Sequence, residues 1–207
     1  MSDERTIRLN IVDDEDLVRN SLATVLRIAD YQVETFSSGV DFIKALPELD
    51  PDCVILDVRM PQMNGLDVLD IVKQHKQRTP VIMISGYADI QMAVKAIQTG
   101  AADFIEKPVD AEAVLKVVAR ACGGARKTDD EDPSGAEFEA VLANLTKRET
   151  EVLKLLVKGD QNKIVARKLG ISPRTVEVHR SRIMQRLGAK SFAELVRMTV
   201  LGGFKAD

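Results

Sequence analysis

The sequence predicts a doubly wound α/β domain with a five-stranded parallel sheet, followed by a small all-α domain of four helices. Two observations support this. Over the first 120 residues, short apolar runs alternate five times with amphipathic stretches, a pattern typical of a parallel sheet with helices on both faces. Beyond residue 140 the apolar residues recur at helical spacing, and capping residues or glycines bound each helix.

The elements of the first domain follow one another at regular intervals. The expected strands are Arg8–Val12, Gln32–Phe36, Cys53–Leu56, Val81–Ile84 and Asp103–Ile105, and the expected helices lie near 15–28, 38–46, 65–76, 88–98 and 110–121. With the strand order 2-1-3-4-5, the order reverses between the first and third strands. Ligands of such open sheets bind at this point, beyond the carboxyl ends of the strands.

The region between the two domains has the composition of a linker. It holds Gly123-Gly124, an acidic run at 129–132 and the turn-forming Pro133-Ser134-Gly135, and it has too few apolar side chains to bury a core. We therefore expect domains at 1–122 and 141–207, joined by a linker at 123–140.

The four helices of the second domain have clear boundaries. Thr146 with Glu149, Ser172 with Pro173, and Ser191 with Glu194 mark three starts, Asn162 begins the remaining helix, and Gly159, Gly170 and Gly188 mark ends.

The charge is divided unequally between the two halves. The chain has a net charge of −3, yet the part from Asn144 onward carries 14 basic and 6 acidic residues, whereas the rest carries 15 basic and 26 acidic residues. An acidic half suits metal or cationic groups, and a basic half suits a polyanion such as DNA.

The cysteine content and the lack of long apolar segments argue against a disulfide-stabilised, zinc-binding, secreted or membrane-spanning protein. Cys53 and Cys122 belong to no CxxC or Cys/His cluster, so we expect neither a disulfide framework nor a zinc site. No secretory signal and no apolar stretch near the ~20 residues of a membrane span is visible. We expect a soluble cytoplasmic protein with no membrane partner.

Polar residues follow four of the expected strands. Asp13-Asp14 end the first, Asp57 the third, Ser85 the fourth and Lys107 the fifth. Three carboxylates in one crevice need a counter-charge, because like charges raise each other's pKa. Mg²⁺ prefers such oxygen ligands, Lys107 adds a positive charge, and the Ser85 hydroxyl can donate to a phosphoryl oxygen. The pattern predicts a carboxylate nucleophile for phosphoryl transfer.

The same residues resemble the receiver family, whose fold is flavodoxin-like. The matching stretches are Ile11–Glu15, Leu56–Pro61 with Asn64-Gly65, Ile84–Gly86 and Phe104–Pro108. The resemblance implies that Asp57 is the phosphoacceptor and that Asp13, Asp14, Asp57 and the Arg59 carbonyl bind Mg²⁺. It further implies that Ser85 and Phe104 are switch residues, that Lys107 contacts the phosphate, and that the Lys107-Pro108 peptide is cis. Ser85 stands where threonine is commoner, and Gly86 follows it.

The expected helix from Pro173 to Leu187 has two distinct faces. Val176, Ile183 and Leu187 form an apolar stripe, and Val178 lies roughly opposite among polar residues. Such a helix suits a DNA major groove, where a valine can touch a thymine methyl group, Glu177 and Ser181 can address base edges, and arginines can hold phosphates. The candidate DNA contacts are Asn162, Lys163, Ser172, Arg174, Thr175, Glu177, Val178, Ser181 and Arg182.

The stretches Leu145–Leu153, Asn162–Ala166 and Ser172–Leu187 resemble the helix-turn-helix of the FixJ/NarL/LuxR family. Together the two resemblances imply a FixJ-like response regulator of a two-component system. From this resemblance we expect a sensor histidine kinase to phosphorylate the protein, and the phosphorylated protein to dimerise through the fourth helix, fifth strand and fifth helix. We also expect it to bind a double-stranded DNA operator and to regulate transcription, with RNA polymerase as a further candidate partner. Glu177 replaces a basic residue of some relatives, so base preference does not carry over.

Two alternatives remain open from the sequence. The crevice of a phosphohydrolase with an aspartyl-phosphate intermediate would look similar, but Asp57-Val58-Arg59 lacks the second aspartate that many such enzymes use as an acid. We expect no enzyme activity beyond self-phosphorylation and slow self-dephosphorylation. The other alternative is a DNA-binding protein that acts independently of phosphorylation.

Overall fold

The structure, a computed structural model, describes residues 6–86, 90–123, 138, 141–189, 191–202 and 204. The contacts between residues divide the chain into two compact units, 1–87 with 99–126 and 88–98 with 127–207, and each is described by itself. The predicted linker, 123–140, lies almost entirely outside the described residues.

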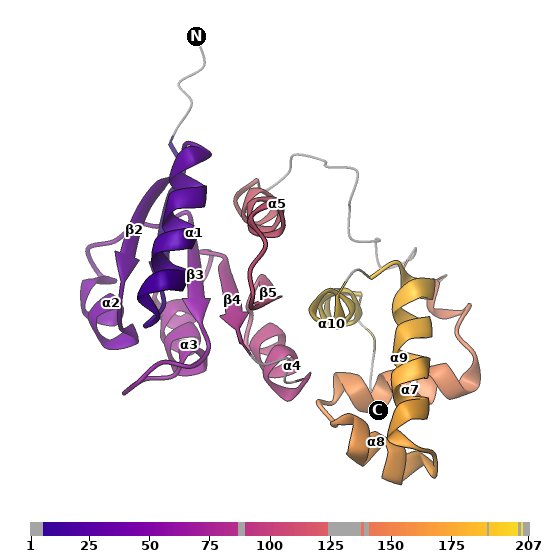
Figure 1. Cartoon of the computed structure of the whole chain (residues 1–207). Helices are drawn as coiled ribbons and strands as arrows, with labels where there is room; N and C mark the ends of the chain where they lie inside the picture. Colours follow the sequence, from indigo (N-terminus) through magenta and orange to yellow (C-terminus); the bar gives the residue numbers. More distant parts are fainter. Residues whose placement is uncertain are drawn as a thin grey trace. The chain divides into compact units, whose positions relative to one another are not determined.

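The first part of the chain contains a five-stranded parallel sheet in the order β2-β1-β3-β4-β5 (Figure 1). The strands are β1 (Arg8–Val12), β2 (Gln32–Phe36), β3 (Cys53–Asp57), β4 (Val81–Ser85) and β5 (Asp103–Glu106). All residues of β3 and β4 are buried, whereas β2 at the sheet edge is partly exposed. The predicted fold class and strand order are confirmed.

Within the described part of the chain, five helices connect or follow the strands. They are α1 (Asp16–Ile28), α2 (Gly39–Ala45), α3 (Gly65–His75), α4 (Ile90–Gln98) and α5 (Ala111–Cys122). Each begins and ends within two residues of its expected bounds, except that 88 and 89, where the fourth was expected to begin, lie outside the described residues. Asn64 and Asp110 cap α3 and α5 with their side chains.

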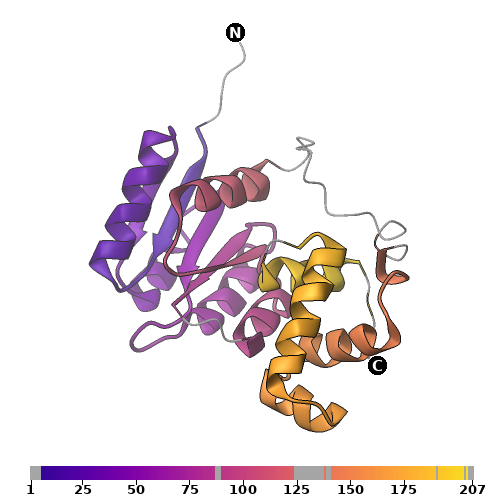
Figure 2. The same cartoon turned by 45° about the vertical axis from the view of Figure 1, so that its right-hand side comes forward.

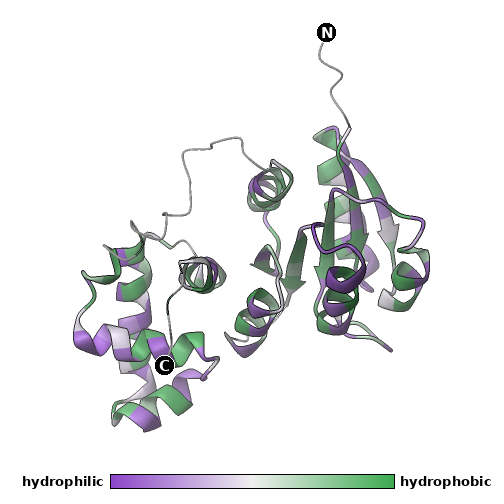
Figure 3. Cartoon of the chain, turned by 180° about the vertical axis from the view of Figure 1, so that it is seen from behind, coloured by the Kyte–Doolittle hydropathy of each residue, from purple (hydrophilic) through white to green (hydrophobic). Residues whose placement is uncertain are grey.

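The core on one face of the sheet lies between the strands and helices α1 and α5. Alternate strand residues such as Ile11 and Ile55 meet Leu26 of α1 and Val118 of α5, all of them fully buried. Figure 3 shows this distribution, with hydrophobic colour along the central strands and mixed colours on the helices around them. The sheet is therefore a rigid base from which residues at the strand ends project.

The second part of the chain contains α7 (Lys147–Val157), α8 (Asn162–Leu169), α9 (Pro173–Leu187) and α10 (Phe192–Leu201). Thr146 and Glu149 form the predicted capping box, and Gly170 and Gly188 end α8 and α9 in the left-handed conformation. Helix α9 packs against α7 and α8 (Figure 2). No helix within the described residues has the length and apolar character needed to cross a membrane.

Candidate acidic site and nucleic-acid interface

The register of the sheet brings the predicted polar residues to one edge. Asp57 is the last residue of β3 and Ser85 the last of β4, while Asp13 directly follows β1 and Lys107 directly follows β5. In the sheet, Val12 pairs with Leu56 and Asp57 pairs with Ile84, so the carboxyl ends of β1, β3 and β4 are aligned. The amide of Lys107 donates to the carbonyl of Ser85 at 2.8 Å, so the fifth strand ends at the same level.

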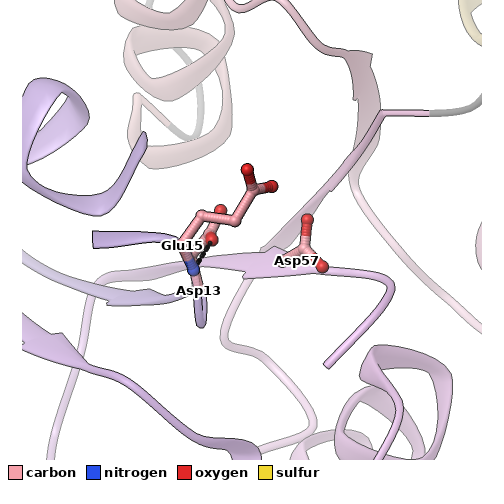
Figure 4. A group of neighbouring side chains, drawn as sticks. All are labelled: Asp13, Glu15 and Asp57. Atoms are coloured by element: carbon pink, nitrogen blue, oxygen red, sulfur yellow. Dashed lines mark hydrogen bonds between the residues drawn. The ribbon is translucent and has the colours of Figure 1, made fainter. Parts of the chain in front are cut away.

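Three carboxylates converge at this edge, from Asp13, Glu15 and Asp57. Each offers one oxygen within 4.8 Å of the others (Figure 4). Asp13 and Asp57 are buried, with 1% and 4% of their surface exposed, whereas Glu15 is exposed. The site is thus a shallow acidic crevice with two buried carboxylates and one at its rim.

A single lysine neutralises part of this charge. The Nζ of Lys107 lies 2.7 Å from Oδ1 of Asp57 and 3.0 Å from Oδ2 of Asp13. It also lies 2.7 Å from Oε1 of Glu15. Only 11% of the lysine side chain is exposed. Among the residues that the structure describes, this one ammonium group is shared by three carboxylates, so their negative charge is only partly offset.

Burial and hydrogen bonding shift the pKa values of these groups. Burial raises the pKa of both Asp13 and Asp57, and it outweighs the opposing hydrogen bonds from Lys107. Burial by itself lowers the pKa of Lys107, but its hydrogen bonds to Asp57, Glu15 and Asp13 outweigh that effect and raise the pKa. The lysine is therefore a permanent cation beside carboxylates that are costly to ionise.

The structure differs from the sequence prediction in the identity of the third carboxylate. Asp14 was expected beside Asp13 and Asp57, but it lies at the bend after β1 with its side chain exposed. Glu15, at the N-cap position of α1, reaches Lys107 with its longer side chain. The role of Asp14 as a metal ligand stays a prediction. Glu15 was not predicted as a site residue, although it belongs to the receiver-like stretch Ile11–Glu15.

Backbone groups orient the two buried carboxylates. The amide of Arg59 donates to Oδ2 of Asp57 at 2.6 Å, and the amide of Glu15 donates to Oδ1 of Asp13 at 2.8 Å. Gly65, the first residue of α3, passes so close that a Cβ there would lie 2.1 Å from the carbonyl oxygen of Asp57. Glycine is thus required for α3 to start against the end of β3.

The donor set fits a hard divalent cation. All three side chains provide carboxylate oxygens, the ligands that Mg²⁺ and Ca²⁺ prefer. The buried Oδ2 of Asp13 has the ion pair with Lys107 but no well-oriented hydrogen bond, so it retains lone pairs for a cation. The residues therefore form an acidic pocket capable of binding a metal ion.

The other predicted residues belong to the strands that end at the crevice or closely follow them. Ser85 and Phe104 are both buried, with Phe104 on β5. Arg59 contributes its amide to Asp57, as described above, and the role of its carbonyl as a metal ligand stays a prediction. The Lys107-Pro108 peptide is cis, as the family resemblance implied.

The second candidate site is the exposed face of α9. Val176, Ile183 and Leu187 are buried, so the predicted apolar stripe is confirmed. On the opposite side Val178 is 44% exposed. The candidate contacts Ser172, Arg174, Glu177, Ser181 and Arg182 on this helix and its cap are exposed, as is Lys163 of α8, whereas Asn162 and Thr175 are half-buried.

Local hydrogen bonds hold α9 in place. Ser172 caps the helix by accepting from the amide of Thr175 at 3.0 Å, so both side chains have a structural role at the start of the helix. Near its end, Arg186 lies 3.5 Å from the buried Glu149 and donates to the carbonyl of Asn144 at 2.7 Å. This contact of Arg186 with Glu149 was not predicted from the sequence, which indicated only the capping role of Glu149.

Known protein families match both the N-terminal and the C-terminal part of the chain. The family profile described as "Response regulator receiver domain" matches residues 9–119, and that described as "Bacterial regulatory proteins, luxR family" matches 143–199.

Proteins of similar length match nearly the whole chain. The transcriptional regulatory protein FixJ of Azorhizobium caulinodans is 39% identical, with 96% of this chain and 94% of that protein covered. The response regulator protein TmoT of Ectopseudomonas mendocina is 40% identical over 96% and 90%. The crystal structure of full-length FixJ from B. japonicum is 34% identical over 97% of this chain and 100% of that one, with a TM-score of 0.55.

Proposed function

This chain belongs to the two-component transcriptional response regulators that join a receiver domain to a LuxR-type DNA-binding domain, and we propose that Asp57 accepts the phosphoryl group from its partner histidine kinase. The observation that carries this assignment is the contact between Asp57 and Lys107. Among the three converging carboxylates, Asp57 is both buried at a strand end and paired at 2.7 Å with the lysine.

The chemistry of phosphoryl transfer fits the groups around Asp57. An ionised oxygen of Asp57 attacks the phosphorus of the kinase's phosphohistidine, the P–N bond breaks, and the histidine imidazole leaves. The Lys107 ammonium stabilises the negative charge on the phosphoryl oxygens. The amide of Arg59 fixes the carboxylate so that it presents one orientation. The Ser85 hydroxyl, on the neighbouring strand end, donates to a phosphoryl oxygen once it is transferred.

Mg²⁺ is the proposed cofactor of this crevice. Asp13 and Asp57 would hold it, with the Arg59 carbonyl and either Glu15 or Asp14 completing the protein ligands. When bound, the ion supplies positive charge that offsets both the carboxylates and the incoming phosphoryl oxygens. Because burial raises the pKa of Asp13 and Asp57, the ion also favours the charged carboxylates that the reaction requires.

Phosphorylation changes the charge balance of the crevice, and we propose that this change is transmitted to the dimerisation face. The new phosphoryl group draws Ser85 and Lys107 toward itself, and Phe104 repositions on β5. The face formed by α4, β5 and α5 then pairs with a second copy. Two DNA-binding domains in one dimer match paired half-sites on DNA.

Helix α9 is the proposed recognition helix. Val178 contacts a thymine methyl group, Glu177 and Ser181 address base edges, and Arg174 and Arg182 bind phosphates. Asn162, Lys163, Ser172 and Thr175 meet the DNA backbone where α8 and the cap of α9 approach it. A DNA operator as the target makes the cytoplasm its place of action and RNA polymerase a further partner.

The catalytic chemistry we propose is limited to the protein's own aspartate. The chain takes up a phosphoryl group and loses it slowly to water, with no turnover of an external phosphoester. Multiple turnover of such a substrate by the purified protein would contradict this proposal.

The test compares wild type with Asp57→Asn after incubation with acetyl phosphate and Mg²⁺. Asp70→Asn is a matched control, because Asp70 is an exposed aspartate on α3. Intact mass should show one added phosphoryl group on wild type and on the control, and none on Asp57→Asn. Equal phosphorylation of all three proteins would refute the assignment.

Oligomeric state and DNA binding measured on the same samples test the switch. We expect a dimer and tighter binding, in gel shifts on duplexes enriched from a random-sequence pool, only where Asp57 is phosphorylated. Full affinity in Asp57→Asn would instead favour DNA binding that is independent of phosphorylation.

A further inference from the structure

The two cysteines of the chain lie together in the receiver domain although they are far apart in sequence. Cys53 begins β3, and Cys122 is the last residue of α5. Cys53 is fully buried in the core cluster between the sheet and helices α1 and α5, and Cys122 packs against the same cluster. Both thiols are free.

The two thiols lie close together at this place in the core. Both side chains pack in the same cluster, and the interaction with the other cysteine is the largest cause of the pKa shift of each thiol. Their exposure differs, because Cys53 has no exposed surface whereas Cys122 is half-buried at the end of its helix. A reagent in solution can therefore reach Cys122 first.

The interaction also makes the two thiols chemically unequal. The interaction with Cys122, together with burial, raises the pKa of Cys53 well above its usual range. The same interaction lowers the pKa of Cys122. The more accessible sulfur is thus the one that more readily becomes a thiolate, the reactive form of cysteine.

We propose that Cys53 and Cys122 form a reversible disulfide by exchange with a small-molecule disulfide such as oxidised glutathione. The arrangement is an accessible attacking thiol with a buried resolving thiol beside it, which is typical of redox-sensitive cysteine pairs. This modification site is separate from the acidic crevice, because Cys53 is at the opposite end of β3 from Asp57.

The exchange proceeds in two balanced steps. The Cys122 thiolate attacks one sulfur of oxidised glutathione, which breaks that S–S bond and releases one glutathione thiolate. The Cys53 thiol then loses its proton and attacks the Cys122 sulfur, which forms the Cys53–Cys122 bond and releases the second glutathione. The protein loses two hydrogen atoms, and both protons end on the two reduced glutathione molecules.

The disulfide ties the C-terminal end of α5 to the start of β3. It closes a loop from residue 53 to residue 122 and so restricts the unfolded chain. We expect the thermal unfolding midpoint of the oxidised receiver domain to rise relative to that of the reduced protein, and reduction with dithiothreitol to reverse the shift.

The test exposes the native full-length protein to oxidised glutathione and blocks remaining thiols with N-ethylmaleimide in denaturant. Wild type should lose both alkylation sites. A non-reducing tryptic digest should link the peptide 45–59, which holds Cys53, to the peptide 121–126, which holds Cys122.

Two variants separate the roles of the thiols. In Cys53→Ala the mixed disulfide on Cys122 has no resolving partner, so one glutathione should stay attached. In Cys122→Ser no glutathione should be attached, because the remaining thiol is buried. Wild type that keeps both free thiols, retains glutathione on Cys122, or forms only disulfide-linked dimers would overturn the proposal.

Discussion

The acidic crevice and the exposed face of α9 differ in how far their polar and charged side chains are exposed to water. The crevice gathers charged groups that are largely withdrawn from water, and the burial of Asp13 and Asp57 raises their pKa values. The face of α9 that we propose to bind DNA instead leaves its polar and charged side chains exposed, around Val178, which is not part of the core. Folding therefore disfavours the ionised form of the carboxylates in the crevice. The exposed side chains of α9 keep their contact with water and carry no such cost.

This difference predicts where each site is vulnerable. In the crevice, the start of α3 packs directly against the end of β3, where a Cβ on Gly65 would clash with the carbonyl of Asp57, so an added methyl group has no space. On α9 the scaffold is set by the buried stripe on the far side, so the exposed face can change with little effect on folding.

Gly65→Ala should damage the crevice most severely. The added Cβ would lie 2.1 Å from the carbonyl oxygen of Asp57, and backbone atoms cannot move aside as a flexible side chain can. We expect a loss of about 3 kcal/mol in the free energy of unfolding, with phosphorylation by acetyl phosphate strongly reduced. Denaturant unfolding and intact mass measure the two effects.

Gly170→Ala is the matched control in the DNA-binding domain. Gly170 has φ +65°, and nothing lies within 4 Å of the position of an added Cβ. The substitution should therefore cost only the strain of a left-handed alanine, about 1 kcal/mol, and leave phosphorylation intact. Equal losses for the two glycine variants would mean that α3 does not press against Asp57.

Val178→Asp should have the reverse profile, with function lost and stability kept. The aspartate removes an apolar contact and places a negative charge beside the phosphates, so sequence-specific binding should be abolished. Specific binding usually exceeds non-specific binding by about a thousandfold or more, so we expect affinity to fall at least about a hundredfold in gel shifts.

Ile28→Asp is the control for this variant. Ile28 is 78% exposed at the end of α1, so it is also an exposed apolar residue but lies outside the DNA-binding domain. DNA affinity should be unchanged by it. Normal affinity of Val178→Asp, or an equal loss in both variants, would contradict the assignment of α9 as the recognition helix.

Much of the crevice could be predicted because parallel strands end at a common edge. That rule alone places Asp57, Ser85 and Lys107 together once the strand order is known. It could not decide between Asp14 and Glu15, because the direction of a side chain beyond a strand depends on the bend that follows. The longer side chain of Glu15 reaches the ammonium group of Lys107 and so joins Asp13 and Asp57 in the crevice.

Contacts between distant elements were harder to predict than the faces of single elements. Helical spacing identified Val178 as exposed and Val176 as buried, because both follow from the period of one helix. The pairing of Cys53 with Cys122 depends on how the end of α5 lies against the start of β3, and no local pattern encodes that position. The ion pair between Arg186 and Glu149 could not be predicted from the sequence for the same reason.

The smallest expected effects are two stability changes of opposite sign. Burial raises the pKa of Asp57, so its charged form opposes folding at neutral pH. Hydrogen bonds from Thr146 are the largest cause of the lowered pKa of Glu149, with a further contribution from Arg186, so its charged form favours folding. Without added metal at pH 7, Asp57→Asn should gain about 1 kcal/mol and Glu149→Gln should lose about 1 kcal/mol.

The pH dependence distinguishes this explanation from a simple change of packing. A group with a raised pKa costs stability only as the pH rises through that pKa, so the advantage of Asp57→Asn should vanish on acidification. A group with a lowered pKa contributes stability that disappears as the pH falls below its usual range, so the deficit of Glu149→Gln should shrink too. Thermal unfolding of both variants and wild type between pH 7 and acid measures this, and differences that stay constant with pH would mean that ionisation is not their cause.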